Sequence, residues 1–380
     1  MTDPKQLWGD DAFTHRLAEL VWTRPLAVLL HLNERSTGHP ARDWLTAWAP
    51  RFMPREDLSV LVLGCGDGWL ERALAREPWV GHIDACDFAA DAVARARALA
   101  PPRVSYRVLD LDRDPIAGRY DAIVAHSVLH HVENLEHAFA EIDAALAPGG
   151  TLIVNEYVGP NRFQFSDRVL DLINEILRAL PPRLRRSTMR GDVYEAKVRP
   201  TVPEMVHNDP SEAARAEELL PLIRGCYDVL DERHLGGTLM QHLLYDIAAC
   251  FELDDPQARS LLQMMLTFEG ALVDEGLLAS DFVLCAARRC GAPPFRERAV
   301  ELPPLPAEAV DWRPSGAHWL RKLAGIARLA GDPRRPTLDP PPPEGEATWD
   351  AVLASAGGDP DVRRMLEALR RAYLRASASR

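Results

Sequence analysis

The stretch VLVLGCGDG, residues 60–68, constrains the fold more than any other part of the sequence. An apolar run, which predicts a buried strand, leads directly into Gly64, Gly66 and Gly68. Glycine lets the backbone turn tightly and approach a ligand without a clashing Cβ atom. A helical pattern follows at 69–76. The stretch therefore predicts a strand, a tight turn and a helix, with or without a ligand at the turn.

The alternation of strand and helix continues from this stretch to residue 157. Apolar or β-branched runs predict strands at 58–63, 83–86, 104–109, 120–126 and 151–155. Strands joined by single helices form parallel sheets with right-handed crossovers. Weaker patterns add strands at 227–231 and 281–287, and we expect the last strand to run antiparallel. We predict an α/β, Rossmann-like doubly wound fold with a mostly parallel seven-stranded sheet.

Changes in pattern along the chain predict five parts. The first carries helical spacing and should cap the site, and the third breaks the alternation and should form a helical lid over it. The last is rich in proline, including Pro340–Pro343, and ends in a basic amphipathic helix that we expect to dock a partner or a second copy. The parts are cap helices 1–50, core 51–158, lid insertion 159–224, end of the sheet 225–290 and C-terminal tail 291–380.

Composition excludes several classes of protein. The formal net charge of −12 is unfavourable for binding nucleic acid, which needs a concentrated basic surface. No apolar run approaches the roughly 18 residues of a membrane span. The six cysteines form no C-x-x-C pair, and the polar N-terminus lacks the apolar segment of a signal peptide. We therefore expect a reduced, cytoplasmic location.

Asp87 closes the strand that follows the glycine turn. An acid at this place can accept hydrogen bonds from both hydroxyls of a ribose, although aspartate also commonly caps a helix. The glycine turn and the acid together predict an adenosine-type ligand. The glycines read G-x-G-x-G and not the G-x-G-x-x-G of dinucleotide sites, which disfavours a nicotinamide cofactor.

With these features the sequence resembles the class I S-adenosylmethionine-dependent methyltransferases, closely over 58–157 and loosely over 225–288. GCGDG, YDAIVAHSVLHHV and LAPGGTLIVNEY resemble three motifs of that family. The resemblance implies S-adenosylmethionine as the cofactor, with Asp87 on the ribose, Phe88 against adenine and Asp110 on the adenine amino group. One departure is Val62, where the family often has an acid that holds the methionine ammonium. The full set of cofactor residues so implied is Gly64, Cys65, Gly66, Gly68, Asp87, Phe88, Asp110, Leu111 and His126.

Two histidines and an acid are the candidates for catalysis. Methyl transfer from a sulfonium mainly needs alignment, but a hydroxyl acceptor also needs a base. His130 and His131 follow the fourth strand and Glu156 ends the fifth, so all three lie at the ligand-binding edge of the sheet. We expect one histidine to be the base, with His130 the first choice, and Glu156 to orient a histidine or the acceptor. Either imidazole can instead cap a helix or contact the cofactor.

Further polar residues follow the fifth strand in a loop that should face the acceptor. They are Tyr157, Arg162 and Gln164, and an ordinary structural role in the loop is an equal alternative. The histidines at 126, 130, 131 and 137 do not predict a metal, because the family likeness explains most of them and no cysteine joins them. We expect no metal.

The leading hypothesis is a methyltransferase that acts on an oxygen of a small-molecule, secondary-metabolite or sugar acceptor. N-methylation of a small molecule or peptide is the nearest rival. A non-catalytic S-adenosylmethionine-binding regulator and a nicotinamide oxidoreductase are further alternatives. The sequences EYVGPNRFQFSDRVLDLIN and DPSEAARAEELLPLI also resemble a bacterial subgroup of the family that often accompanies polysaccharide or secondary-metabolite genes.

Overall fold

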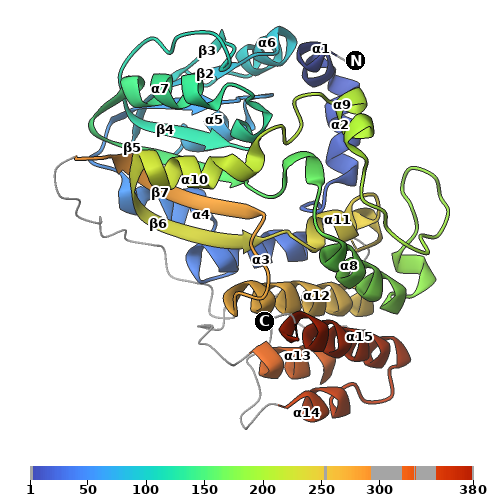
Figure 1. Ribbon diagram of the computed structural model, residues 1–380. Coiled ribbons are helices and arrows are strands. Elements are labelled where there is room, and N and C mark those ends of the chain that lie inside the picture. The colour runs from blue at the N-terminus through green and yellow to red at the C-terminus, as the bar shows by residue number, and fades with distance from the viewer. Residues whose placement is uncertain (1–2, 252–254, 292–318, 329, 331–347, 379–380) are drawn as a thin grey trace.

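The computed structural model describes residues 3–251, 255–291, 319–328, 330 and 348–378. Pro340–Pro343 and most of the predicted linker lie outside these residues. A seven-stranded sheet of order β3-β2-β1-β4-β5-β7-β6 forms the centre of the molecule (Figure 1). Its strands are β1 Leu58–Leu63, β2 Val80–Asp87, β3 Val104–Val108, β4 Tyr120–His126, β5 Leu146–Tyr157, β6 Tyr227–Gly236 and β7 Phe282–Arg289.

The pairing of the strands confirms the predicted fold class. Strands β1 to β5 pair in parallel, whereas β7 runs antiparallel to both of its neighbours, β5 and β6. The strand order reverses between β1 and β4, and ligands bind beyond the carboxyl ends of the strands at such a switch point. The sheet therefore has one edge where a site is expected.

Both faces of the sheet are buried because its central strands carry apolar side chains on both faces. Val60 and Val62 of β1 point into one core with α5 Trp69–Leu74 and α6 Ala90–Ala98. Leu61 and Leu63 point into the other core with α7 Leu135–Ala145 and α10 Ala216–Cys226. Side chains alternate along a strand, so a continuous apolar run is the signature of a sheet covered by helices on both faces.

A helical layer lies along the β6 side of the sheet and has an apolar core of its own (Figure 1). The buried pair Lys322–Glu34, at 2.9 Å between Nζ and Oε2, ties this layer to the N-terminal part of the chain. The helices of the layer are α8 Asp167–Ala179, α11 Met240–Leu244, α12 Pro256–Asp274, α13 Trp319–Arg328, α14 Trp349–Ala354 and α15 Pro360–Ser377.

Helix α15 is the basic amphipathic helix that the sequence assigned to docking. Its apolar residues, among them Met365, Leu366 and Leu369, are fully buried in the same core as α8 and α12. Arg371 adds a bond to Glu175 of α8, at 2.6 Å. The hypothesis of docking through its apolar face is therefore corrected, because the chain itself covers that face.

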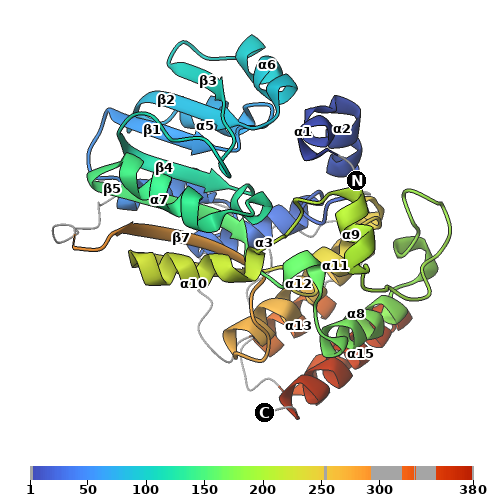
Figure 2. The same cartoon turned by 45° about the horizontal axis from the view of Figure 1, so that its top comes forward.

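The N-terminal helices lie in two places. Figure 2 shows α1 Pro4–Gly9 and α2 Asp11–Leu20 beyond the carboxyl ends of the strands, next to α6. Helix α3 Leu26–Thr37 packs against β6 and α12, and α4 Trp44–Ala47 and α9 Val202–Asn208 are shorter. None of the helices in the described ranges is both long and apolar enough to cross a bilayer.

Candidate active site

A cavity of about 800 Å³ lies at the carboxyl ends of β1, β2 and β4. Its walls include the glycine turn on one side and α1, with Lys5 and Trp8, on the other. It extends from Asp87 to His131. The cavity thus joins the predicted nucleoside residues to one of the predicted catalytic histidines.

Gly64 is the residue at which the turn requires glycine. Its φ is +70°, and a Cβ atom built on it would lie 2.5 Å from the side chain of Val128. Any other residue would therefore be strained in its backbone and would collide with the loop after β4. The close approach of that loop brings the ends of β1 and β4 together around the cavity.

Asp87 both shapes the turn and faces the cavity. Its Oδ2 accepts a hydrogen bond from Gly66 N and its Oδ1 one from Ala89 N, each at 2.9 Å. Burial raises the pKa of Asp87, and the backbone donors act in the opposite direction. A carboxylate oxygen can accept two hydrogen bonds, so each oxygen keeps capacity for one ribose hydroxyl. The helix-capping alternative is wrong, because the N-cap of α6 is Ala89, which has no side-chain cap bond, and Asp87 instead holds the turn before the helix.

Helix α1 covers the end of the cavity at which adenine is expected. Lys5 Nζ lies 2.8 Å from Asp110 Oδ2. Burial alone would raise the pKa of Asp110, but the bonds from Lys5 and from the Asp112 amide hold it below its usual value. Phe88 and Leu111 are apolar residues in the same part of the wall. The residues at this end therefore fit an adenosine group.

The remaining predicted cofactor residues lie as follows. Cys65, Gly66 and His126 line the cavity, whereas Gly68 turns the chain into α5 and packs near Tyr106. Burial lowers the pKa of His126, which favours a neutral ring. Its Nδ1 has no hydrogen-bond partner among the described residues, so a polar group of a ligand would satisfy a buried atom there.

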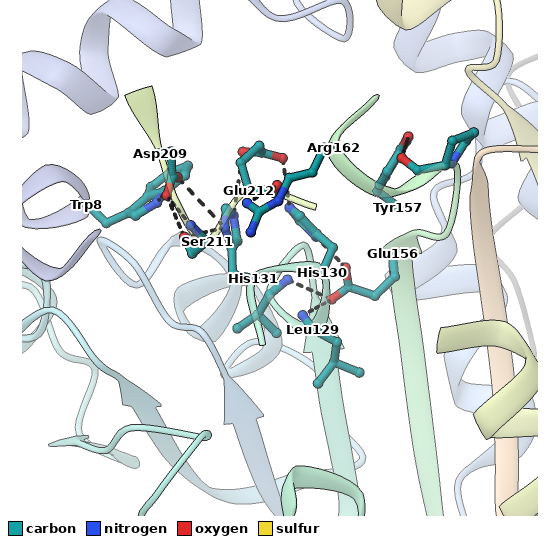
Figure 3. A network of polar contacts seen from close by, with 12 residues as sticks. Trp8, Leu129, His130, His131, Glu156, Tyr157, Arg162, Asp209, Ser211 and Glu212 are labelled. Carbon is teal, nitrogen blue, oxygen red and sulfur yellow. Dashed lines mark hydrogen bonds and ion pairs between the residues drawn. The ribbon is translucent and has the colours of Figure 1, made fainter. Parts of the chain in front are cut away.

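Glu156 and His130 form a buried pair behind the acceptor end of the cavity (Figure 3). Glu156 Oε1 accepts hydrogen bonds from the amides of Val128 and Leu129, at 2.6 and 2.8 Å. Glu156 Oε2 lies 2.8 Å from His130 Nδ1. The carboxylate thus fixes both the backbone of the loop and the orientation of the His130 ring.

His131 stands on the cavity wall, whereas His130 is not among the lining residues. His131 Nδ1 lies 3.1 Å from Ser211 Oγ, and the Ser211 hydroxyl donates to Asp209 Oδ1 at 2.6 Å. Trp8 of α1 donates from Nε1 to Asp209 Oδ2 at 2.8 Å, and its ring contacts that of His131. His131, the second candidate for the base, therefore faces the cavity, whereas His130, the first candidate, does not line it.

Glu212 faces both histidines. Its Oε1 lies 3.7 Å from His130 Nε2 and its Oε2 lies 4.0 Å from His131 Nε2. Burial raises the pKa of Glu212, while the charges of His130 and Arg162 act against the rise. Burial would lower the pKa of His130, but Glu156, Glu212 and Asp209 together raise it. Burial and the charges of His130 and Arg162 lower the pKa of His131 well below its usual value.

Asp209, Ser211 and Glu212 were not found by reasoning from the sequence. They belong to the stretch DPSEA in the insertion between β5 and β6, where two acids and a serine are an unremarkable surface composition. Only the fold brings this stretch to the histidines after β4. The only feature that could have indicated them was the number of acidic residues in a segment that was expected to cover the site.

The predicted substrate residues are not among those that line the cavity. The Tyr157 hydroxyl donates to Pro160 O, and Gln164 Nε2 donates to the carbonyls of Arg162 and Pro200. Arg162 Nη1 donates to the carbonyl of Glu212 at 2.9 Å. The structure therefore places Arg162 against the stretch that carries Glu212, Tyr157 in the packing of its own loop, and Gln164 between that loop and the segment before α9.

Comparison with known proteins identifies the core. Residues 60–150 match a family model described as a methyltransferase domain. An uncharacterized methyltransferase of Mycobacterium tuberculosis is 37% identical over 113 residues, which cover 29% of this chain and 56% of the relative. A malonyl-[acyl-carrier protein] O-methyltransferase of Halalkalibacterium halodurans is 29% identical over 133 residues, or 32% of this chain and 49% of the relative. The chain thus spans about half the length of these curated relatives.

Among solved structures, an S-adenosylmethionine-dependent methyltransferase from Mesorhizobium loti aligns over 64% of this chain and 95% of its own. The identity is 21% and the TM-score is 0.38. Residues 60–150 form a methyltransferase domain of the class I, S-adenosylmethionine-dependent type, as the resemblance implied.

Proposed function

We propose that this chain transfers a methyl group from S-adenosylmethionine to an oxygen of a small-molecule or sugar acceptor. The observation that carries the proposal is that one continuous cavity runs from Asp87 to His131 in a chain with a methyltransferase domain. Asp87 would hold the ribose hydroxyls, Phe88 and Leu111 would contact adenine, and the Gly64 turn would approach the methionine part. S-adenosylmethionine supplies a methyl group that its positive sulfur already activates for displacement.

The charge at the acceptor end favours oxygen over nitrogen. The carboxyl groups of Glu156, Asp209 and Glu212 gather there with the guanidinium of Arg162, which also lies 3.9 Å from Glu133. Nearby negative charge stabilises a protonated amine, and a protonated amine has no lone pair with which to attack. A neutral hydroxyl does not suffer this handicap, because it is activated by losing a proton.

The acceptor hydroxyl must lose its proton at this cluster. The sequence-based hypothesis assigns the proton to His130 or His131, with Glu156 holding His130. The 2.8 Å contact between Glu156 and His130 supports the orienting role, and the position of His131 on the wall supports direct contact with the acceptor. Alignment by the buried walls supplies the other part of the rate enhancement.

The test is turnover with a panel of hydroxylated metabolites and nucleotide sugars, followed by mass spectrometry. We expect S-adenosylhomocysteine to accumulate together with an acceptor heavier by one CH₂ unit on oxygen. Methylation on nitrogen alone would support the rival enzyme. Cofactor binding without turnover on any acceptor would support the regulator. We also propose a cytoplasmic location, which is supported by six cysteines that form no disulfide.

A further inference from the structure

Three metal-ligand groups converge beside the acceptor end of the cavity, where His131 is the one of the three that lines the wall. His130, His131 and Glu212 each offer one ligand atom within 4.8 Å of the other two. The Glu212 carboxylate lies 3.7 Å and 4.0 Å from the two Nε2 atoms, distances that are too long for hydrogen bonds. Figure 3 shows the carboxylate facing both rings. Contacts that fall short of hydrogen bonds leave these atoms available to a shared ligand.

The partner of His131 determines which of its nitrogens carries the proton. The Ser211 hydroxyl has one proton, which it donates to Asp209 Oδ1. Ser211 Oγ can therefore only accept from His131, so His131 Nδ1 carries hydrogen. In the neutral ring Nε2 then holds a lone pair, and this lone pair faces Glu212.

The same argument applies to His130. Glu156 accepts two backbone N–H groups through Oε1, and its Oε2 accepts from His130 Nδ1. Nδ1 therefore carries hydrogen and Nε2 holds the lone pair of the neutral ring. A carboxylate bonded to the far nitrogen is the usual support of a metal-bound histidine, because it fixes the tautomer and the ring orientation.

We propose that His130 Nε2, His131 Nε2 and the Glu212 carboxylate bind a divalent transition-metal ion such as zinc. Three electron-pair donors meet at one place, so a cation is the ligand that suits all of them. Two imidazoles and one carboxylate with an open fourth position form a ligand set typical of catalytic zinc. Ligand atoms of a tetrahedral zinc lie about 3.4 Å apart, for bonds of about 2.1 Å. The observed separations require only small side-chain rotations.

The local charge also favours an ion. The carboxyl groups of Glu156, Asp209 and Glu212 lie there, and the guanidinium of Arg162 is shared with a fourth, that of Glu133, at 3.9 Å. Buried charges are costly unless they are paired or coordinate metals. A divalent ion together with Arg162 would balance three ionised carboxylates. Reasoning from the sequence did not identify this set, because Glu212 is distant from the histidines along the chain.

The ion would explain how the acceptor is activated, and this role rests on the proposed function. A hydroxyl bound at the open position has a lowered pKa and releases its proton to water at neutral pH. The two imidazoles then act as ligands and not as bases. Binding of the ion itself does not depend on methyl transfer, so the two proposals can fail separately.

The experiment measures metal binding to the full chain, with any affinity tag removed and with bound metal stripped by a chelator. Titration with Co²⁺ is followed by visible absorption and titration with Zn²⁺ by calorimetry. We expect one ion per chain and the absorption bands of four- or five-coordinate cobalt. Glu212→Gln and His131→Gln should each weaken binding about 100-fold or more, and Glu156→Gln about 10- to 100-fold.

His137→Gln is the matched control. His137 lies on the same segment, but its half-buried ring is turned to a different partner, with Nε2 3.3 Å from Asp114 O. This variant should bind Co²⁺ like the wild type. The melting temperature and S-adenosylhomocysteine affinity of each variant show whether it is folded.

Each outcome decides between the proposals. No Co²⁺ uptake by the wild type, or unchanged uptake by folded Glu212→Gln and His131→Gln, would overturn the metal site. Methyl transfer that persists after chelation would overturn only the role of the ion in activating the acceptor. Stoichiometric binding without methyl transfer to any acceptor would remove only the proposed function. Loss of turnover on chelation and its return with Zn²⁺ or Co²⁺ would support both.

Discussion

The two ends of the cavity are built in different ways. The nucleoside end comes from successive strand ends of one continuous segment, with Gly64 after β1, Asp87 at the end of β2 and Asp110 just after β3. The acceptor end is assembled from three distant segments: α1 with Trp8, the loop after β4 with the histidines, and the insertion with Glu212. The first end is a local motif and the second is a product of the tertiary fold.

This difference predicts that substitutions at the two ends have separable effects. The largest is expected at the acceptor end. His130→Ala should lower kcat by about 10²- to 10⁴-fold, because the hydroxyl loses either its base or a ligand of its activating ion. The S-adenosylhomocysteine dissociation constant, measured by calorimetry, should change little. A large loss of cofactor affinity in the folded variant would show that the two ends do not act separately.

A substitution in the helical layer should affect neither end. Leu366 of α15 is fully buried in the core formed with α8 and α12. Leu366→Ala should lower the free energy of unfolding by about 2–5 kcal/mol, through lost burial and a residual cavity. Chemical denaturation measures this loss, and kcat below the unfolding transition serves as the control. A negligible change in stability would mean that α15 does not belong to the core.

Asp87→Ala tests the nucleoside end. Loss of a charged acceptor for two hydroxyls should cost roughly 1.5–3 kcal/mol of binding free energy, which is a weakening of about 10-fold or more. Calorimetry with S-adenosylhomocysteine measures it. The value of kcat at saturating cofactor should stay near that of the wild type. Unchanged affinity in a folded Asp87→Ala protein would remove this residue from the site.

The buried carboxyl of Glu71, on α5 near the nucleoside end, should make the stability of the protein depend on pH. Burial raises the pKa of this α5 carboxyl to about 8. The folded state therefore holds a proton that the unfolded state has lost, so stability falls as pH rises toward the folded-state pKa. Between about pH 6 and about pH 9 the melting temperature of the wild type should fall more than that of Glu71→Gln. Parallel curves for the two proteins would contradict the burial of an ionisable group there.

The smallest effect is expected from Lys5, which joins α1 to Asp110 across the cavity. The lysine side chain is 45% exposed, so the ion pair should contribute at most about 1 kcal/mol. Lys5→Ala should raise the cofactor dissociation rate about two- to fivefold, and added salt should reduce the difference. Stopped-flow fluorescence measures the rate. An effect of Lys5→Ala on kcat alone would mean that Lys5 acts at the acceptor end and not at the nucleoside end.

The local structure at the nucleoside end could be predicted from the sequence because its information is local, whereas the ligand contacts of its residues stay predictions. The strand positions, the turn at Gly64 and the acid at Asp87 follow from short patterns whose spacing the fold preserves. Val62, which stands where the family often has an acid, is buried in a core of the sheet. His126, whose Nδ1 has no hydrogen-bond partner among the described residues, lies on the cavity wall.

The acceptor end was only half predicted. The histidines and Glu156 were found because strand ends meet at one edge of the sheet. Glu212 and Trp8 were not found, because no pattern in the sequence encodes how an insertion or a terminal helix folds back. The tail was misjudged for the same reason, since the amphipathic pattern of α15 does not say whether its partner is another chain or α8.

The central claim is that one cavity holds the nucleoside at Asp87 and directs the reactive sulfur toward His131. A crystal structure of the chain with S-adenosylhomocysteine tests it most directly. The account predicts the ribose hydroxyls on the Asp87 carboxylate, adenine between Phe88 and Leu111, and the sulfur facing the wall formed by His131. A nucleoside bound elsewhere, or a sulfur that faces away from that wall, would contradict it.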